Sequence, residues 1–207
     1  MTAFPVVVFV TDPSRGLERT CAVVEAAAKA LGPGRLAVQL RDKEDRARRA
    51  AWGPVLRAVT HRARASLVVN GDVDLTLVTG ADGVHVPVDG IHDARRRLGP
   101  AALVTTPAHA DDDVRRAREG GASAALVSPI HPTPGKAPAR GTTALTSARA
   151  IAGSQLAVIA LGGIDPRCVA ACAAAGADGV AVIRALYESS DPGAIASALA
   201  APWARGL

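Results

Sequence analysis

The sequence predicts an α/β fold, a parallel eight-stranded (β/α)8 TIM barrel formed by residues 1–207 as a single domain. Short apolar runs rich in β-branched residues alternate along the chain with longer segments of helical period. This alternation is typical of parallel βαβ units, and eight such units in 207 residues favour a closed barrel. An open doubly wound sheet is the alternative, because periodicity does not reveal whether a sheet closes.

Each expected strand is too short for a helix and rich in β-branched residues. The strands are expected at residues 6–11, 36–40, 66–69, 83–86, 102–105, 124–127, 157–160 and 179–183. Helices are expected between them at residues 17–31, 44–63, 73–79, 91–98, 111–120, 143–152, 165–175 and 191–200. Related phrases at residues 80–84, 121–125 and 176–180 each begin with a helix-ending Gly before a strand, which indicates one repeated structural solution.

The composition is that of a globular protein, with 49% hydrophobic and 21% charged residues. Aromatic residues make up only 2%, so we expect a core of aliphatic side chains and strands buried on both faces. The net charge of +5 is carried mainly by arginines on expected helix faces. Because aromatic side chains for base stacking are so few, we expect no nucleic-acid partner.

The three cysteines form no spaced framework, which indicates a reducing compartment. We interpret Cys168 and Cys172, four residues apart, as small core residues, with redox or metal chemistry as the alternative. The first ten residues lack the features of a signal peptide, and no apolar run is long enough to span a bilayer. We therefore expect a cytoplasmic protein without membrane association. The sequence is compatible with a homo-oligomer and does not define the oligomeric state.

Polar residues alternate at the end of the second expected strand, where Gln39, Arg41 and Lys43 would share one side. If Val38 and Leu40 pack outward, this set faces the mouth of the barrel. A guanidinium beside an ammonium group suits phosphate or pyrophosphate. The alternative is the start of a helix, with Asp42 as its cap and Lys43 in solvent.

Further polar residues follow other expected strands. Asn70 ends the third strand, where it would cap the next helix or contact a ligand. His85 in the fourth strand fits an interior position with its hydrogen bonds made. His109 follows the fifth strand and is better placed for proton transfer. The Pro- and Gly-rich residues 128–141, with Thr133 and Lys136, follow the sixth strand as a lid or ligand loop, unless the loop is merely disordered. Gly162 and Gly163 after the seventh strand, before an expected helix, suit a phosphate, and Arg184 after the eighth could add a charge.

These segments together resemble the thiamine phosphate synthase and thiazole tautomerase family. The matching phrases run in order through residues 10–12, 38–43, 70–74, 80–85, 129–136, 160–164 and 175–182, nearly the whole chain. The resemblance implies a (β/α)8 barrel that joins hydroxymethylpyrimidine pyrophosphate to a thiazole phosphate and releases pyrophosphate with the help of Mg²⁺. It implies a pyrimidine contact for Gln39, a thiazole-side contact for Thr133 and a thiazole-phosphate site at Gly162 and Gly163. It implies pyrophosphate contacts for Arg41, Lys43, Asn70 and Lys136.

The sequence departs from the family pattern at the metal. The two positions where synthases of this family usually carry Mg²⁺-ligating Asp residues are Gly71 and Gly90 here. Asp72 and Asp89 each stand one residue away and are the candidate ligands, although a shift by one residue changes the direction of a side chain. Arg184 replaces a usual Ser. Mg²⁺ is therefore a weakened expectation.

Three functions follow as alternatives. The first is a synthase-type transferase in thiamine biosynthesis. The second is a metal-independent thiazole tautomerase, in which His109 would move the proton. The third is a non-catalytic barrel that binds phosphorylated ligands after losing its metal site.

Overall fold

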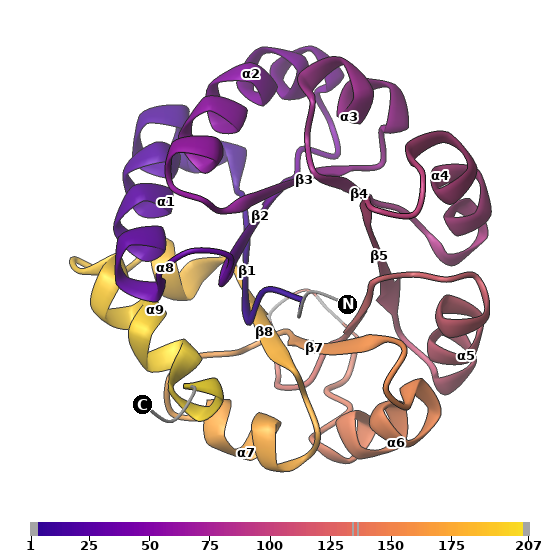
Figure 1. The fold of residues 1–207 in the computed structure, drawn as a ribbon. Helices are drawn as coiled ribbons and strands as arrows, with labels where there is room; N and C mark the ends of the chain where they lie inside the picture. The colour runs from indigo at the N-terminus through magenta and orange to yellow at the C-terminus, as the bar shows by residue number, and fades with distance from the viewer. Residues whose placement is uncertain (1–3, 134, 136, 205–207) are drawn as a thin grey trace.

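Eight parallel strands close into a barrel, and helices surround it (Figure 1). The structure is a computed structural model that describes residues 4–133, 135 and 137–204. The strands are β1 (Val7–Val10), β2 (Leu36–Leu40), β3 (Ser66–Asn70), β4 (Gly83–His85), β5 (Leu103–Ala108), β6 (Ala124–Val127), β7 (Ala157–Leu161) and β8 (Gly179–Val182). Each strand pairs with the next, and β8 pairs with β1, which confirms the barrel and rules out the open sheet.

The main helices follow the strands in order and form the outer ring. They are α1 (Leu17–Leu31), α2 (Arg46–Arg62), α3 (Val73–Thr79), α4 (Ile91–Leu98), α5 (Asp111–Glu119), α6 (Thr143–Ala152), α7 (Val169–Ala174), α8 (Arg184–Tyr187) and α9 (Pro192–Ala200). Short 3-10 turns occupy Pro13–Arg15, Val88–Gly90 and Ala201–Trp203. None of the described helices is both long and apolar enough to cross a membrane.

Alternation along the strands divides the core into two layers, as the two-residue period requires. Val38 and Leu40 of β2 point outward and join the large cluster under the helices. A smaller cluster fills the inside of the barrel and contains Val8, Val10, Ala37, Ala124, Leu126, Ile159 and Ala181. Gln39 therefore faces inward, as the strand pattern predicted.

Closure of the ring depends on a close approach between the first and last strands. Val7 of β1 is in register with Val180 of β8. A Cβ atom added to the neighbouring Gly179 would lie 2.5 Å from the carbonyl oxygen of Val6. Because that atom belongs to the backbone, only glycine lets the strands pair this closely.

The three related sequence segments at residues 80–84, 121–125 and 176–180 connect neighbouring strands at the end of the barrel where the strands begin. The third residue of each segment, Asp82, Ser123 or Asp178, accepts a hydrogen bond from the N–H group of the second residue in a neighbouring strand. The acceptor-to-nitrogen distances are 2.8 Å to Leu67, 3.1 Å to Val104 and 2.7 Å to Val158. The same three side chains also accept from arginines of α2, α4 and α6, namely Arg57, Arg95 and Arg149.

Most of the expected elements agree closely with the structure. Two differences are that β5 continues to Ala108 instead of ending at residue 105, and that the short helix α8 was not expected. A third difference lies near the seventh strand. A helix was expected over residues 165–175, but α7 begins at Val169, because Asp165 and Cys168 form a turn instead. Gly162 and Gly163 therefore do not open a helix directly. The expectation of a helix N-terminus beside these glycines was wrong.

We expect Asp178→Ala to lower the free energy of unfolding by about 1–3 kcal/mol, because the buried N–H group of Val158 loses its acceptor. Urea unfolding measures this change. Glu25→Ala is the matched control, because Glu25 pairs with Arg62 on the exposed helix surface. This change should lower the free energy of unfolding by less than about 0.5 kcal/mol. Equal losses in the two variants would show that Asp178 acts only as another surface charge.

Candidate functional site

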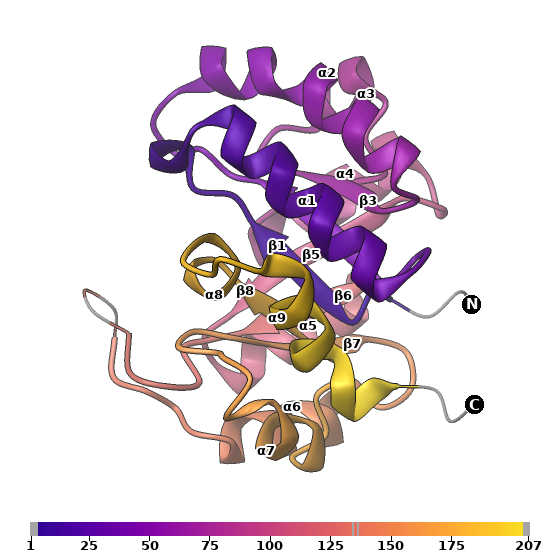
Figure 2. The same cartoon turned by 90° about the vertical axis from the view of Figure 1, so that its left-hand side faces the viewer.

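The carboxyl ends of the strands meet at one mouth of the barrel, where parallel β/α barrels carry their functional groups. The long connection between β6 and α6 projects from this side, opposite the two termini (Figure 2). One surface hollow lies elsewhere, beside Ser66 and Leu103, which begin β3 and β5. The convergence of polar side chains, rather than that hollow, marks the candidate site.

A layer of polar side chains forms the floor of the mouth across four consecutive strands. The Gln39 amide on β2 donates to the Asn70 side-chain oxygen on β3 at 3.0 Å. On the next two strands, His85 Nδ1 and Thr105 Oγ1 lie 2.9 Å apart. Asn70 and His85 are in register, so the two pairs adjoin. Thr105 was not among the expected site residues, although its position at the end of an expected strand could have indicated it.

Arg41 is fixed at the rim by a contact that the sequence analysis missed. Thr11, just after β1, accepts from the Arg41 N–H at 2.9 Å and donates to the Arg41 carbonyl at 3.3 Å. One hydroxyl therefore holds both backbone groups of Arg41. The position of Thr11 at the end of a strand was the available signal.

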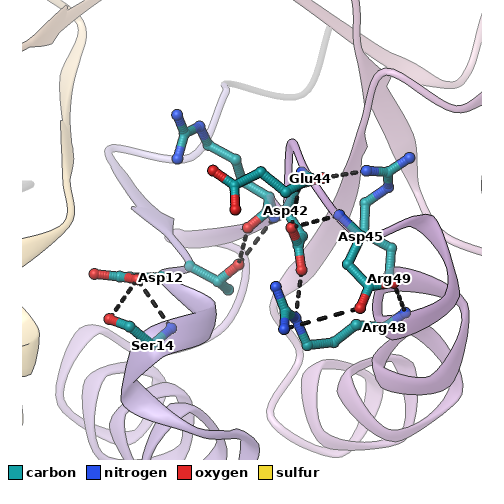
Figure 3. Close-up of polar contacts among 9 residues, drawn as sticks. Asp12, Ser14, Asp42, Glu44, Asp45, Arg48 and Arg49 are labelled. Carbon is teal, nitrogen blue, oxygen red and sulfur yellow. Dashed lines mark hydrogen bonds and ion pairs between the residues drawn. The ribbon is translucent and has the colours of Figure 1, made fainter.

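The turn that carries Lys43 is held by its neighbour Asp42 (Figure 3). This buried carboxylate accepts the N–H groups of Glu44 and Asp45, both at 3.0 Å, and pairs with Arg48. Burial raises the pKa of Asp42, but the Arg48 and backbone hydrogen bonds outweigh it and lower that pKa overall. The cap of α2 is Asp45, so Asp42 organises the turn and leaves Lys43 exposed.

Most arginines of the described chain donate to acids or carbonyls, but a few cations have no such partner there. The side chains without a hydrogen bond or ion pair to another described residue are Arg41, Lys43, Arg184, Lys29 and Arg64. Arg41, Lys43 and Arg184 follow strand ends at the mouth, whereas Lys29 and Arg64 lie near the opposite end. These three cations at the mouth are therefore not held in ion pairs with the described acids.

The pKa of His85 is affected by the same positive charge. Burial, followed by the positive charges of Arg41 and Lys43, lowers the pKa of His85 from 6.5 to about 4. Both cations are therefore close enough to act on the floor of the mouth. At neutral pH His85 is uncharged and serves as a hydrogen-bonding group rather than a cation.

Gly162 and Gly163 lie directly against the segment that follows β6. The Ile130 N–H donates to the Leu161 carbonyl at 2.9 Å, and the His131 N–H donates to the Gly162 carbonyl at 3.0 Å. Both glycines have positive φ, and a Cβ on Gly163 would lie 2.7 Å from the Cβ of His131. Glycine is therefore required here by packing between the two loops as well as by any ligand.

The remaining expected residues are distributed around the mouth. The exposed His109 lies with Nδ1 3.1 Å from the Ser128 carbonyl oxygen, and Thr133 donates to the nearby His131 carbonyl at 3.1 Å. Arg184 is exposed at the first position of α8. Lys136 lies outside the described residues.

The two candidate Mg²⁺ ligands are engaged elsewhere. Asp72 caps α3 by accepting from the Leu75 N–H at 2.8 Å, and its other oxygen accepts from Arg46 at 2.8 Å. Burial raises the pKa of Asp72, but these hydrogen bonds and the arginines beside it lower that pKa overall. Asp89 is 84% exposed and pairs with Arg116. Among the described residues no three acids or histidines gather at the mouth, so the carboxylates do not fit a Mg²⁺ site.

We expect the stability of the protein to fall by up to about 3 kcal/mol as the pH drops from 6.5 to 4 on account of His85. Above this range His85 is neutral in both states. Within it the unfolded chain binds a proton that the folded protein does not, so lower pH favours unfolding. Urea unfolding of wild type and His85→Gln across this range measures the contribution.

Proton NMR titration tests the origin of the shift. Arg41→Ala should raise the pKa of His85 partway toward 6.5, because burial remains when the charge is removed. Arg64→Ala at the opposite end should leave it unchanged. A His85 midpoint near 6.5 in wild type would contradict the buried, neutral imidazole.

Comparison with known proteins gives matches over most of the chain. The family model described as thiamine monophosphate synthase matches residues 7–186. The thiamine-phosphate synthase of Thiobacillus denitrificans is 40% identical over 197 residues, covering 92% of each chain. The thiamine-phosphate synthase of Moorella thermoacetica is 36% identical over 180 residues, covering 85% of this chain and 86% of that protein.

Solved structures agree with these matches. Thiamine phosphate pyrophosphorylase from Pyrococcus furiosus superimposes with a TM-score of 0.79 at 25% identity, covering 97% of this chain and 96% of that one. Orotidine 5′-phosphate decarboxylase from Pyrococcus horikoshii has a TM-score of 0.71 at 14% identity, which shows the shared fold alone. The resemblance predicted from the sequence motifs is thus confirmed, and the chain belongs to the thiamine monophosphate synthase family.

Proposed function

We propose that this protein is a transferase that joins hydroxymethylpyrimidine pyrophosphate to a thiazole phosphate and releases pyrophosphate. Family membership supports the reaction. The observation that carries the proposal is the pair of unneutralised cations, Arg41 and Lys43, above a buried polar floor at the barrel mouth. A leaving group with several negative charges requires such positive groups, held in place before the reaction.

Each part of the mouth has a role in this proposal. Arg41 and Lys43 bind the pyrophosphate and stabilise the charge that develops as it departs, and Asn70 contributes a polar contact. Gln39, oriented by its hydrogen bond to Asn70, contacts the pyrimidine. The thiazole nitrogen then captures the pyrimidine cation.

The thiazole phosphate is assigned to the turn of Gly162 and Gly163, near the end of β7. Arg184 at the end of β8 supplies a charge on that side, and Thr133 contacts the thiazole. Lys136 completes the pyrophosphate contacts in the family pattern. The two phosphate-bearing groups would thus enter from opposite arcs of the barrel mouth.

No step of this proposal is assigned to Mg²⁺. In the family pattern the ion accompanies pyrophosphate, but Asp72 is held by Arg46 and the α3 cap, and Asp89 pairs with Arg116. Neutralisation of the leaving group is therefore assigned to the side chains of Arg41 and Lys43.

A second candidate, a thiazole tautomerase, is favoured by the geometry of His109. A carbonyl oxygen only accepts hydrogen bonds, so the Ser128 carbonyl places a proton on His109 Nδ1, and in the uncharged imidazole the lone pair then lies on Nε2. The lone pair on Nε2 is then available to take a proton from a substrate. A third candidate, a barrel that binds phosphorylated ligands without turnover, retains the cations but requires no chemistry.

We expect the purified protein, given both substrates and Mg²⁺, to form thiamine phosphate and pyrophosphate. Arg41→Ala and Lys43→Ala should each lower kcat/KM by roughly 10- to 100-fold, the effect of losing one charge-assisted hydrogen bond. Arg64→Ala is the matched control, because it removes an unpartnered arginine far from the mouth. Chromatographic detection of thiamine phosphate and an enzymatic pyrophosphate assay measure the two products.

If no thiamine phosphate forms at high protein concentration, the transferase proposal is wrong. Binding of the thiazole phosphate without turnover would then favour the non-catalytic barrel. An equal loss of activity in Arg64→Ala and Arg41→Ala would remove the assigned role of the mouth cations.

We expect His109→Gln to retain transfer activity within about threefold, because the transferase proposal gives this imidazole no proton to move. If the protein is instead a tautomerase, the variant should lose about 100-fold or more of the proton exchange of a thiazole carboxylate phosphate in deuterated water. Proton NMR follows the exchange. Unchanged exchange in His109→Gln would exclude His109 as the base.

A further inference from the structure

A histidine and two cysteines meet behind the two-glycine turn that follows β7. His131 comes from the loop after β6, Cys168 precedes α7, and Cys172 lies within α7. One ligand atom from each, an imidazole nitrogen and two sulfurs, lies within 4.8 Å of the others. Within the described chain this is the one group of three or more His, Cys, Asp or Glu side chains with such spacing.

His131 supplies an observation that packing alone does not explain. Its Nε2 atom is buried and has no hydrogen-bond partner among the described residues. Leaving a buried polar nitrogen without a partner costs about 1–3 kcal/mol. A ligand that accepts the nitrogen lone pair would remove this cost.

The cysteines share one face because they stand four residues apart at the start of a helix. Cys172 is fully buried, whereas Cys168 is partly exposed. Burial, and then the neighbouring Cys168, raises the pKa of the Cys172 thiol to about 12. The Cys172 thiol therefore stays protonated at neutral pH unless a bound cation displaces its proton.

The donor set selects the kind of cation. Imidazole nitrogen and thiolate sulfur are ligands for Zn²⁺, whereas Mg²⁺ takes oxygen ligands. Zn²⁺ bonds of about 2.0–2.3 Å place tetrahedral ligand atoms about 3.5–3.8 Å apart. Because the three atoms lie within 4.8 Å of one another, no pair is separated by more than about 1 Å beyond this spacing.

We propose that His131, Cys168 and Cys172 form a Zn²⁺ site that braces the loop after β6 against the loop after β7. The contacts around the triad support this role. The His131 N–H donates to the Gly162 carbonyl at 3.0 Å, and the Asp165 N–H donates to Cys168 Sγ at 3.3 Å, a contact that a metal-bound thiolate can keep. A cation held by these residues would fix the turn of Gly162 and Gly163 from behind.

Cobalt binding to the full-length protein tests the site, because thiolate-bound tetrahedral Co²⁺ has characteristic charge-transfer and visible absorption. The protein is reduced with a phosphine, stripped of metal with a chelator and titrated with Co²⁺ without oxygen. We expect one equivalent to bind with thiolate-to-cobalt absorption, and Zn²⁺ to displace it. Competition with a chromogenic chelator then gives the Kd for Zn²⁺.

Three variants and one control separate this site from adventitious binding. Cys168→Ser, Cys172→Ala and His131→Asn should each raise the Kd for Zn²⁺ by at least about 100-fold, since even the loss of a residue behind a metal ligand costs 10–100-fold. Cys21→Ser, which removes the remaining cysteine on α1, should bind as wild type does. Zn²⁺ should raise the Tm of wild type and Cys21→Ser but not of Cys168→Ser.

The proposal is overturned if wild type binds Zn²⁺ no more tightly than Cys168→Ser, or if Cys21→Ser loses binding. Circular dichroism confirms that each variant is folded, and the conservative Cys168→Ser change at a partly exposed position keeps the test valid if Cys172→Ala unfolds. Because these measurements use no substrate, their result is independent of the transferase assay.

Discussion

The hydrogen-bonded closure of β8 onto β1 is the constraint on which the rest of the molecule depends. Parallel pairing around a closed ring leaves no free strand edge and brings every carboxyl end to one mouth. The close approach at Gly179 and Val6 allows this closure. Without it, Gln39 on β2 and Leu161 on β7 would lie at distant parts of an open sheet, and their loops could not share a ligand.

The distribution of charge divides the two ends of the barrel by function. At the end where strands begin, Asp82 and Asp178 each accept both a strand N–H and an arginine, so charge there stabilises the fold. At the mouth, Arg41 and Lys43 remain without acidic partners and depress the pKa of His85. An anionic ligand at the mouth would form ion pairs with both side chains.

The loops after β6 and β7 behave as one unit. Backbone hydrogen bonds join Ile130 to Leu161 and His131 to Gly162, and the second glycine of the turn leaves room for the His131 side chain. A phosphate site at this turn would therefore depend on both loops. The cluster of His131 with the two cysteines lies where a cation could hold them together.

The sequence by itself determined the alternation of strands and helices, because burial on both strand faces leaves continuous apolar runs and Gly marks the helix ends. It also placed Gln39 inward and Arg41 at a strand end, since both follow from the two-residue period. The start of α7 at Val169 was not predicted, because residues 165–168 form a separate turn, closed by the Cys168 N–H on the Asp165 carbonyl, before the helix begins.

Only the tertiary structure decided which of these polar residues have partners. Asp72 looked available to a metal in the sequence, but Arg46 from a different helix occupies it. Thr11 holds Arg41, and His131 meets the two cysteines, across long separations in the chain. Such pairings arise when the barrel closes and loops from different strands converge. The local periodicity of the sequence therefore does not predict them.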